Sequence, residues 1–194
     1  MVGELSSGPS WDHLFEVASG QDGLFTTRQA AEAGYSPQLL IHHMHAGRVR
    51  RVRRGVYRVV HFPASEQEDL VAIWLWSERQ GVFSHHSALA LHGLSDALPS
   101  RLHLIVPEAW RRRRLRVPKG VSLHFGDVAR TETAWLGAVP LTTPIRTLRD
   151  CTALPASPDL IRQAVTQCLA RGLATRSELA EVERDLDRSS RPGL

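Results

Sequence analysis

The sequence predicts an α+β fold in two parts: short helices and a β-hairpin at the N-terminal end, then a mixed α/β part that finishes in helices. Three observations support this fold. Apolar residues recur at helical spacing in several segments, two β-branched runs flank an Arg-Gly pair, and prolines and glycines separate the segments. We expect a first domain over residues 1–60, a linker at 61–65 and a second domain over 66–194.

The composition is that of a globular chain with a basic surface. Its 194 residues are 42% apolar, which is enough to build a core in one large domain or two small ones. The formal net charge is +4, and Lys119 is the only lysine among 24 basic residues. Such an arginine-rich surface suits planar, bidentate contacts with phosphates and base edges.

Nothing in the sequence predicts export or membrane insertion. The first residues lack the basic and apolar regions of a leader, and no apolar run approaches the ~18 residues of a membrane span. Cys151 and Cys168 do not form a CxxC pair, so we expect reduced, buried thiols. We therefore expect a cytoplasmic protein.

Three short helices are predicted at the N-terminal end. The first, over residues 11–18, places Trp11, Leu14, Phe15 and Ala18 on one face, and Ser10 can cap it. The second starts at Thr26, which can form a capping box with Gln29. The third starts after Ser36, with Pro37 at its first position. A short helix, a tight turn and a helix of about ten residues is the spacing of a helix-turn-helix.

The third helix is the candidate recognition helix. Its spacing predicts that Leu40, Ile41 and Met44 face the core. The opposite face would enter the major groove of DNA. The residues assigned to that face are Ser36, Gln38, Leu39, His42 and His43.

A basic hairpin is predicted directly after this helix, with Arg54-Gly55 at its turn. The stretch from Ala33 to Val60 holds no acid, so its charge favours a partner outside the stretch, most often a polyanion. A hairpin in this place is a wing, which lies over the phosphate backbone or enters the minor groove. The wing arginines are Arg48, Arg50, Arg51, Arg53, Arg54 and Arg58.

Six short motifs carry a family resemblance. They are LFTTRQA at 24–30, AGYS at 33–36, GRVRRVRRGVY at 47–57, SHHSALALHGL at 84–94, LHLIVP at 102–107 and LTTPIRTLRD at 141–150. Together they resemble the AbiEi-type antitoxins of type IV toxin–antitoxin systems. The resemblance implies a winged helix that represses its own promoter, and a second domain that antagonises a nucleotidyltransferase-like toxin encoded nearby.

The second domain is predicted to begin with a helix over residues 66–80 and to continue with a helix over 84–92. His85, His86 and His92 lie on the second of these helices. His86 cannot share a face with the other two, and no local cysteine or carboxylate joins them, so we expect no metal site.

Strands are predicted at 101–107, 121–125 and within 133–142, and helices at 144–150, 159–171 and 175–187. Thr175 and Glu178 can form a capping box at the start of the last helix. A second basic patch is expected on a hairpin or loop before the second of these strands. It has three open interpretations: contact with phosphates, docking of an acidic partner, or simple solvation. The second basic patch consists of Arg111, Arg112, Arg113, Arg114, Arg116 and Lys119.

No catalytic residues or cofactor site are predicted. The sequence has no phosphate-binding glycine loop, no HExxH and no GxSxG, and its single lysine has no acid nearby in sequence. We expect a DNA-binding transcriptional regulator, an antitoxin that represses its own promoter by binding double-stranded DNA. The alternatives are a protein–protein module whose arginine-rich hairpins dock an acidic partner, and an enzyme whose site is assembled from distant residues.

The predicted interface also implies a pH effect. If His42 and His43 both contact DNA, binding should tighten as the pH falls toward ~6.5, where imidazoles begin to gain charge.

Overall fold

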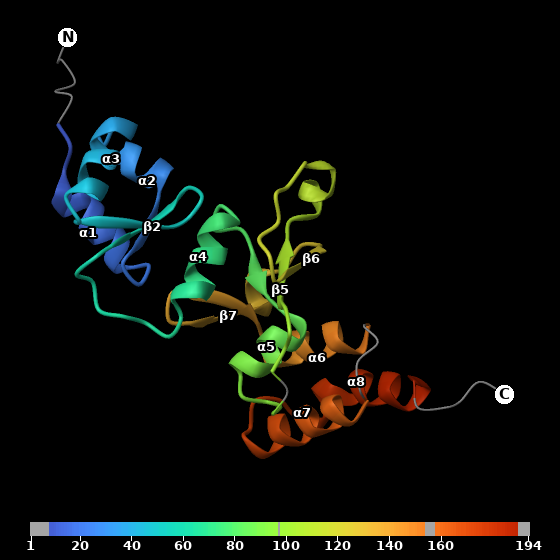
Figure 1. Ribbon diagram of the computed structural model, residues 1–194. Helices are drawn as coiled ribbons and strands as arrows, with labels where there is room; N and C mark the ends of the chain where they lie inside the picture. The colour runs from blue at the N-terminus through green and yellow to red at the C-terminus, as the bar shows by residue number, and fades with distance from the viewer. Residues whose placement is uncertain (1–7, 97, 154–157, 190–194) are drawn as a thin grey trace, which may run out of the picture. The chain divides into compact units, whose positions relative to one another are not determined.

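The computed structural model describes residues 8–96, 98–153 and 158–189. The chain divides into two compact units, Met1–Arg79 and Gln80–Leu194, and each contains its own sheet (Figure 1). The first sheet has the strand order β1-β3-β2, and the second has the order β6-β5-β4-β8-β7. The protein is therefore an α+β protein with N-terminal helices, two sheets and C-terminal helices, as the sequence predicts.

Four helices and three strands make up the described part of the first unit. They are α1 (Trp11–Ser19), β1 (Leu24–Thr26), α2 (Thr27–Glu32), α3 (Pro37–His45), β2 (Val49–Arg53), β3 (Val56–Val59) and α4 (Glu68–Trp76). β3 lies between β1 and β2 and pairs antiparallel with both. The order is helix, strand, helix, helix and hairpin, then α4. The short strand β1 was not predicted from the sequence.

The predicted caps of the first three helices are present. Ser10 accepts a hydrogen bond from the amide of His13, and Ser36 accepts one from the amide of Leu39. Thr26 and Gln29 form the full capping box. These local bonds satisfy amide groups that have no partner within the helix, so they fix where each helix begins.

The core of the first unit gathers side chains from all of its early elements. Leu14, Phe25, Leu40 and Val49 are buried together in one apolar cluster. Phe15, which the sequence places on the apolar face of the first helix, is instead largely exposed. Fewer side chains of α1 therefore pack into the core than the sequence predicts.

The segment predicted as a linker lies inside the first unit. Phe62 packs against the apolar cluster, and it lies so close to Gly23 that a Cβ there would meet its ring at 2.5 Å. Gly23 also has a φ of +78°, which favours glycine. Helix α4, which the sequence assigned to the second domain, packs against β1 and β3, so the division between units falls at Arg79 rather than at 61–65.

The second unit contains five strands, two 3₁₀ turns and four helices in its described residues. They are β4 (Val82–Phe83), α5 (His85–Leu91), β5 (Leu102–Val106), η1 (Glu108–Arg112), β6 (Val121–Phe125), η2 (Arg130–Glu132), β7 (Thr133–Leu136), β8 (Val139–Thr142), α6 (Pro144–Thr152), α7 (Pro158–Ala170) and α8 (Arg176–Ser189). β5 and β6 pair in parallel, as do β4 and β8. The two other pairings, β4 with β5 and β7 with β8, are antiparallel.

One sequence prediction for this unit needs correction. The single strand expected within 133–142 is a pair, β7 and β8, joined by a tight turn. For the second basic patch, the sequence leaves both a hairpin and a loop open. Because β5 and β6 are parallel, the patch lies on the crossover connection between them.

The C-terminal helices share one apolar cluster, and Figure 1 shows α6, α7 and α8 grouped together. Cys151 and Cys168 are both free and buried in it, which confirms the expected burial of both thiols. Thr175 and Glu178 form the predicted capping box at the start of α8, with 2.8 Å from the Thr175 amide to Glu178 Oε2. No helix within the described ranges is long and apolar enough to cross a membrane.

Candidate nucleic-acid interface

The turn between α2 and α3 holds the two helices in a fixed relation. Gly34 has a φ of +86°, and the Tyr35 amide donates to the Ala30 carbonyl at 2.9 Å. This left-handed glycine is a common way to end a helix. The Tyr35 side chain is buried in the core of the first unit, so α3 is anchored from its first turn.

One face of α3 is exposed. Gln38, Ile41, His42 and His45 are all exposed, and they lie at positions i, i+3, i+4 and i+7 of the helix. We call these four residues the exposed face of α3. Ile41, which the sequence assigned to the core, is 50% exposed. His45 is not among the residues that the sequence assigns to this face, although its spacing from Gln38 and His42 places it on the same side of the helix.

His43 and Leu39 do not belong to this face. His43 is only 9% exposed; its ring stacks on Trp11 at 5.8 Å between centroids and meets Tyr35 edge-on at 5.4 Å. Burial lowers the pKa of His43, and the nearby Arg48 lowers it further. Leu39 is half-buried and packs against the apolar cluster, so neither side chain is presented for base contacts.

The hairpin of β2 and β3 lies directly after α3. Its turn is Arg54-Gly55, with Gly55 at a φ of +76°, and the register shifts between Arg51 and Arg53 on β2. The Thr27 amide donates to the Gly55 carbonyl at 3.0 Å. The tip of the hairpin is therefore tied to the start of α2.

Acidic residues of α4 balance part of the positive charge of the hairpin. Glu68 accepts from Arg50 at 2.6 Å through Oε1 and from Arg58 at 2.6 Å through Oε2. Asp69 pairs with Arg53 at 3.4 Å. Half of the six predicted wing arginines therefore have a carboxylate partner within the same unit.

Arg58 is a structural residue and not a surface contact. Its side chain is 5% exposed, and besides Glu68 it donates to the carbonyls of Phe62 at 2.8 Å and Pro63 at 3.0 Å. A buried guanidinium of this kind is stable only when it is paired and hydrogen-bonded. Arg58 therefore holds α4 and the segment before it onto β3, which corrects its assignment to the DNA contacts.

Arg48, Arg51 and Arg54 are the hairpin arginines that remain available. All three are exposed, and none of them forms an ion pair with a residue that the structure describes. Arg48 follows α3 directly, and Arg54 lies at the hairpin turn. The available charge thus runs from the end of the exposed face of α3 to the tip of the hairpin.

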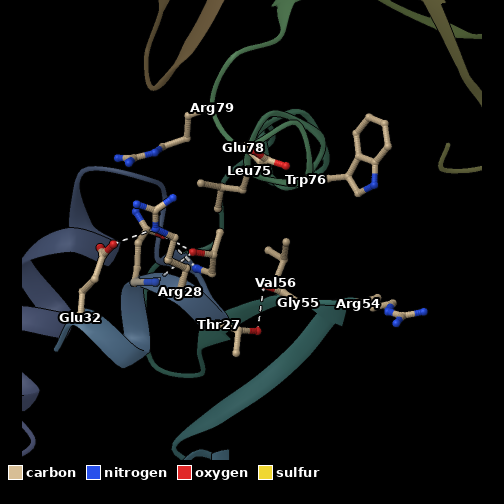
Figure 2. Close-up of a pocket in the computed structure, with 12 residues that line it drawn as sticks. Thr27, Arg28, Glu32, Arg54, Gly55, Val56, Leu75, Trp76, Glu78 and Arg79 are labelled. Atoms are coloured by element: carbon tan, nitrogen blue, oxygen red, sulfur yellow. Dashed lines mark hydrogen bonds and ion pairs between the residues drawn. The ribbon is translucent and has the colours of Figure 1, made fainter. Parts of the chain in front are cut away.

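A pocket lies in the same unit, between α2, the hairpin turn and the end of α4 (Figure 2). Its volume is about 310 Å³, and its lining includes Thr27, Arg28, Trp76 and Arg79. Arg28 is paired with Glu32 at 2.9 Å. Figure 2 shows the Arg54 side chain pointing away from Arg28 and Arg79, so the three arginines do not converge on one ligand position.

The second basic patch is partly engaged by its own surroundings. Arg111 pairs with Glu108 and lies 5.1 Å above the ring of Phe125. Arg113 lies 4.0 Å above the ring of Trp110. The exposed remainder of the patch is Arg112, Arg114, Arg116 and Lys119.

The three histidines of the helix predicted over residues 84–92 do not come together in the structure. His92 Nε2 lies 2.7 Å from the carbonyl of Thr142, while His85 lies beside His103 and His124 instead. His86 contacts only the ring of His103 among these, edge-on at 5.4 Å. No local sequence pattern indicates the second grouping, because its members come from three separate elements.

Comparisons with known proteins agree with the N-terminal motifs. Residues 12–60 match a family model described as "Transcriptional regulator, AbiEi antitoxin". No curated protein matches the chain. The crystal structure of the RV2827C protein from Mycobacterium tuberculosis is similar at 16% sequence identity and a TM-score of 0.43, over 96% of this chain and 79% of that one. The resemblance stated from the sequence is thus confirmed over residues 12–60, where the chain matches the AbiEi antitoxin family of transcriptional regulators.

Proposed function

We propose that the first unit acts as a winged helix-turn-helix that binds duplex DNA, and that the protein represses transcription from its own promoter. The main support for this proposal is the exposed face of α3. Arg48, which has no ion pair with a described residue, follows this face in the sequence. These side chains are not used by the core of the unit. The regulator family matched by residues 12–60 supports the same assignment.

The chemistry of the exposed face fits the major groove. A glutamine such as Gln38 can pair with both hydrogen-bonding positions of adenine, and an exposed apolar side chain such as Ile41 can contact a thymine methyl group. His42 and His45 add hydrogen-bonding groups along the same stripe. These residues would supply sequence preference, and Ser36 at the start of the helix lies where a backbone phosphate is favoured.

The hairpin would supply most of the affinity. Arg48, Arg51 and Arg54 carry three positive charges that no acid of the described unit balances, so they would contact about three phosphates. Arg50 and Arg53 would contribute only where a phosphate competes with Glu68 or Asp69. This division separates residues that read sequence from residues that bind the backbone.

The antitoxin role extends the proposal to the second unit. The resemblance implies a nucleotidyltransferase-like toxin as the partner, and the exposed arginines of the second basic patch would suit an acidic surface on it. The proposal assigns no catalytic activity to the chain, and it places the protein in the cytoplasm, where a regulator of transcription meets its promoter.

One observation favours a second candidate, a protein–protein module without sequence-specific DNA binding. Arg50, Arg53 and Arg58 already pair with carboxylates of the same chain. The hairpin can therefore accept acidic side chains as well as phosphates, and an acidic protein partner would use the same geometry.

Binding to the protein's own upstream region separates the two candidates. Fluorescence anisotropy would compare that duplex with a scrambled duplex of equal length and composition. The regulator proposal requires a clear preference for the upstream region, and a promoter–reporter fusion should be repressed by the wild-type protein. Equal, weak binding of both duplexes near physiological salt would favour the protein–protein module.

A further inference from the structure

Three histidines of the second unit converge although they are distant in sequence. His85 begins α5, His103 lies on β5 and His124 lies on β6. Each offers one ring nitrogen, and these three atoms all lie within 4.8 Å of one another. His103 pairs with Ser122 across the parallel strands, and Ile105 pairs with His124. Because paired residues of parallel strands share a face, His103 and His124 are diagonal neighbours on one side of the sheet.

The spacing of the ring nitrogens is close to the spacing that a metal ion needs. The His85 and His124 rings stack at 3.8 Å between centroids, and His103 Nδ1 and His124 Nε2 form a hydrogen bond of 2.9 Å that a bound ion would replace. Zinc–nitrogen bonds of about 2.0–2.1 Å in a tetrahedral site place two nitrogens about 3.3–3.4 Å apart. The observed separations, from 2.9 Å to at most 4.8 Å, bracket that value.

The charge state of the histidines suits metal binding. Burial lowers the pKa of His85 to about 3, and the neighbouring His124 and His103 lower it as well. Burial and His124 lower the pKa of His103 to about 4, and burial also lowers the pKa of His124. Burial therefore favours the neutral form of these rings, and the neutral imidazole is the form that binds a metal.

The surroundings of His85 orient its ring. The buried hydroxyl of Ser84 lies 2.8 Å from His85 Nδ1, although Ser84 is the N-cap residue of α5 and makes no capping bond with its side chain. If Nδ1–H donates to this hydroxyl, Nε2 keeps its lone pair. A metal-binding histidine almost always donates its other ring N–H to an oxygen in this way.

A buried carboxylate oxygen beside the cluster is left without a partner. Asp150 Oδ1 accepts from Arg146 at 2.8 Å, but Oδ2 is buried and has no hydrogen bond in the structure described here. The charge of Asp150 acts directly on His124. Arg146, the nearest balancing cation, is itself shared with Glu132 at 2.5 Å. A cation bound to the histidines would be favoured by the negative charge of Asp150.

We propose that His85, His103 and His124 bind one divalent transition-metal ion, with Zn²⁺ as the ion that fits best. Three imidazole ligands suit Zn²⁺, and also Ni²⁺ and Cu²⁺, better than Mg²⁺ or Ca²⁺, which prefer oxygen. Three protein ligands leave a fourth position for water or another donor. The ion would link the start of α5 to β5 and β6 and would stabilise the second unit.

The test uses the full chain without an affinity tag, stripped of metal with a chelator. Isothermal titration with Zn²⁺ should give one site per chain, and Co²⁺ should give the visible absorption of a tetrahedral complex. The melting temperature should rise with Zn²⁺ concentration because only the folded state binds the ion. His103→Gln and His124→Gln should each weaken binding at least tenfold, since even changes outside the ligand set cost roughly that much. His61→Ala, an exposed histidine of the first unit, should bind as the wild type does.

Two results would overturn the proposal. One is the absence of a stoichiometric site in the wild-type chain. The other is a site that persists in both glutamine variants and disappears in His42→Ala/His45→Ala, which would place the ion on exposed histidines of α3. If a glutamine variant fails to fold, NMR of the histidine ring nitrogens in the wild type replaces it. Shifts on adding Zn²⁺ that are confined to three histidines of the second unit would support the site, and unchanged spectra would refute it.

Discussion

Glu68 on α4 bridges two arginines of neighbouring strands, with 2.6 Å from its Oε2 to buried Arg58 on β3 and 2.6 Å from its Oε1 to Arg50 on β2. This one carboxylate satisfies a guanidinium that has almost no contact with water. It also occupies an arginine that would otherwise be available to DNA. The stability of the first unit and the charge of its hairpin are therefore linked through α4.

Removing Glu68 should destabilise the first unit. Glu68→Ala leaves the buried charge of Arg58 without its acid, and breaking such a pair costs about 2–4 kcal/mol once the partial exposure of Glu68 is considered. Urea unfolding followed by circular dichroism measures the change. Asp69→Ala is the matched control, because its pair with Arg53 is long and Asp69 is 82% exposed, so it should cost less than about 1 kcal/mol. Equal effects of the two variants would contradict the role given to Glu68.

Releasing Arg53 should strengthen DNA binding. Asp69→Asn removes a negative charge close to the hairpin and frees Arg53 for a phosphate. The affinity for duplex DNA should rise, and the slope of log affinity against log salt should steepen by up to about one unit. Glu66→Gln removes the same charge from an exposed acid that has no ion pair with the hairpin among the described residues, and its slope should stay at the wild-type value. A steeper slope in both variants would indicate a general effect of net charge.

Substitutions of Gln38 and His43 should have different effects. One should change the preference for DNA sequence, and the other should change stability. Gln38→Ala should lower the preference for the upstream region over scrambled duplex by about 1–3 kcal/mol without changing stability, because Gln38 is exposed. His43→Gln should act on stability, because it disturbs the packing of Trp11 and Tyr35. The sequence alone implied that His43 adds to the pH dependence of binding. Since burial lowers its pKa, His43 gains charge only at a lower pH than an exposed imidazole does, and the folded His43→Gln variant should keep most of the wild-type pH dependence of binding.

The two cysteines should be unreactive in the folded protein. Burial raises the pKa of Cys151 to about 12 and raises the pKa of Cys168 as well. A raised thiol pKa means that the reactive thiolate is scarce at pH 8 in the folded state, whereas an unfolded thiol ionises near ~8.5. The raised thiol pKa values stabilise the folded state fully below about pH 8.5, and this stabilisation is lost as the pH rises further. A thiol reagent at pH 8 should label neither cysteine in the native chain and both in denaturant, and rapid labelling of the native chain would contradict the burial of both residues.

The parts of this structure that were predictable from the sequence are those set by local contacts. The caps at Ser10, Thr26 and Ser36 each join residues three positions apart, so their pattern is visible in the chain. The orientation of α3 was predicted only in part. Hydrophobicity placed Ile41 in the core, but the aromatic rings of Trp11 and Tyr35 form a site that His43 fills, and this rotates Ile41 toward solvent.

The remaining features depend on contacts between distant residues. The carboxylates that balance the hairpin come from α4, which no local pattern connects to it. The histidine cluster requires the parallel pairing of β5 with β6, since His85 and His124 lie far apart in the chain and only the sheet brings them together. Local sequence patterns group His85 with His86 and His92. They do not indicate that the neighbours of His85 in the fold are His103 and His124.

In the proposed complex, Arg48, Arg51 and Arg54 bind the phosphate backbone of the DNA that α3 reads. The most direct test measures affinity for the upstream duplex at several salt concentrations, for the wild type and for Arg48→Ala/Arg51→Ala/Arg54→Ala. The matched control is Arg101→Ala/Arg130→Ala/Arg176→Ala, which removes the same charge from exposed arginines of the second unit. We predict a wild-type slope of log affinity against log salt of roughly −3 or steeper, and a loss of about three units in the hairpin variant only. Equal slopes for the hairpin variant and the control would contradict the claim.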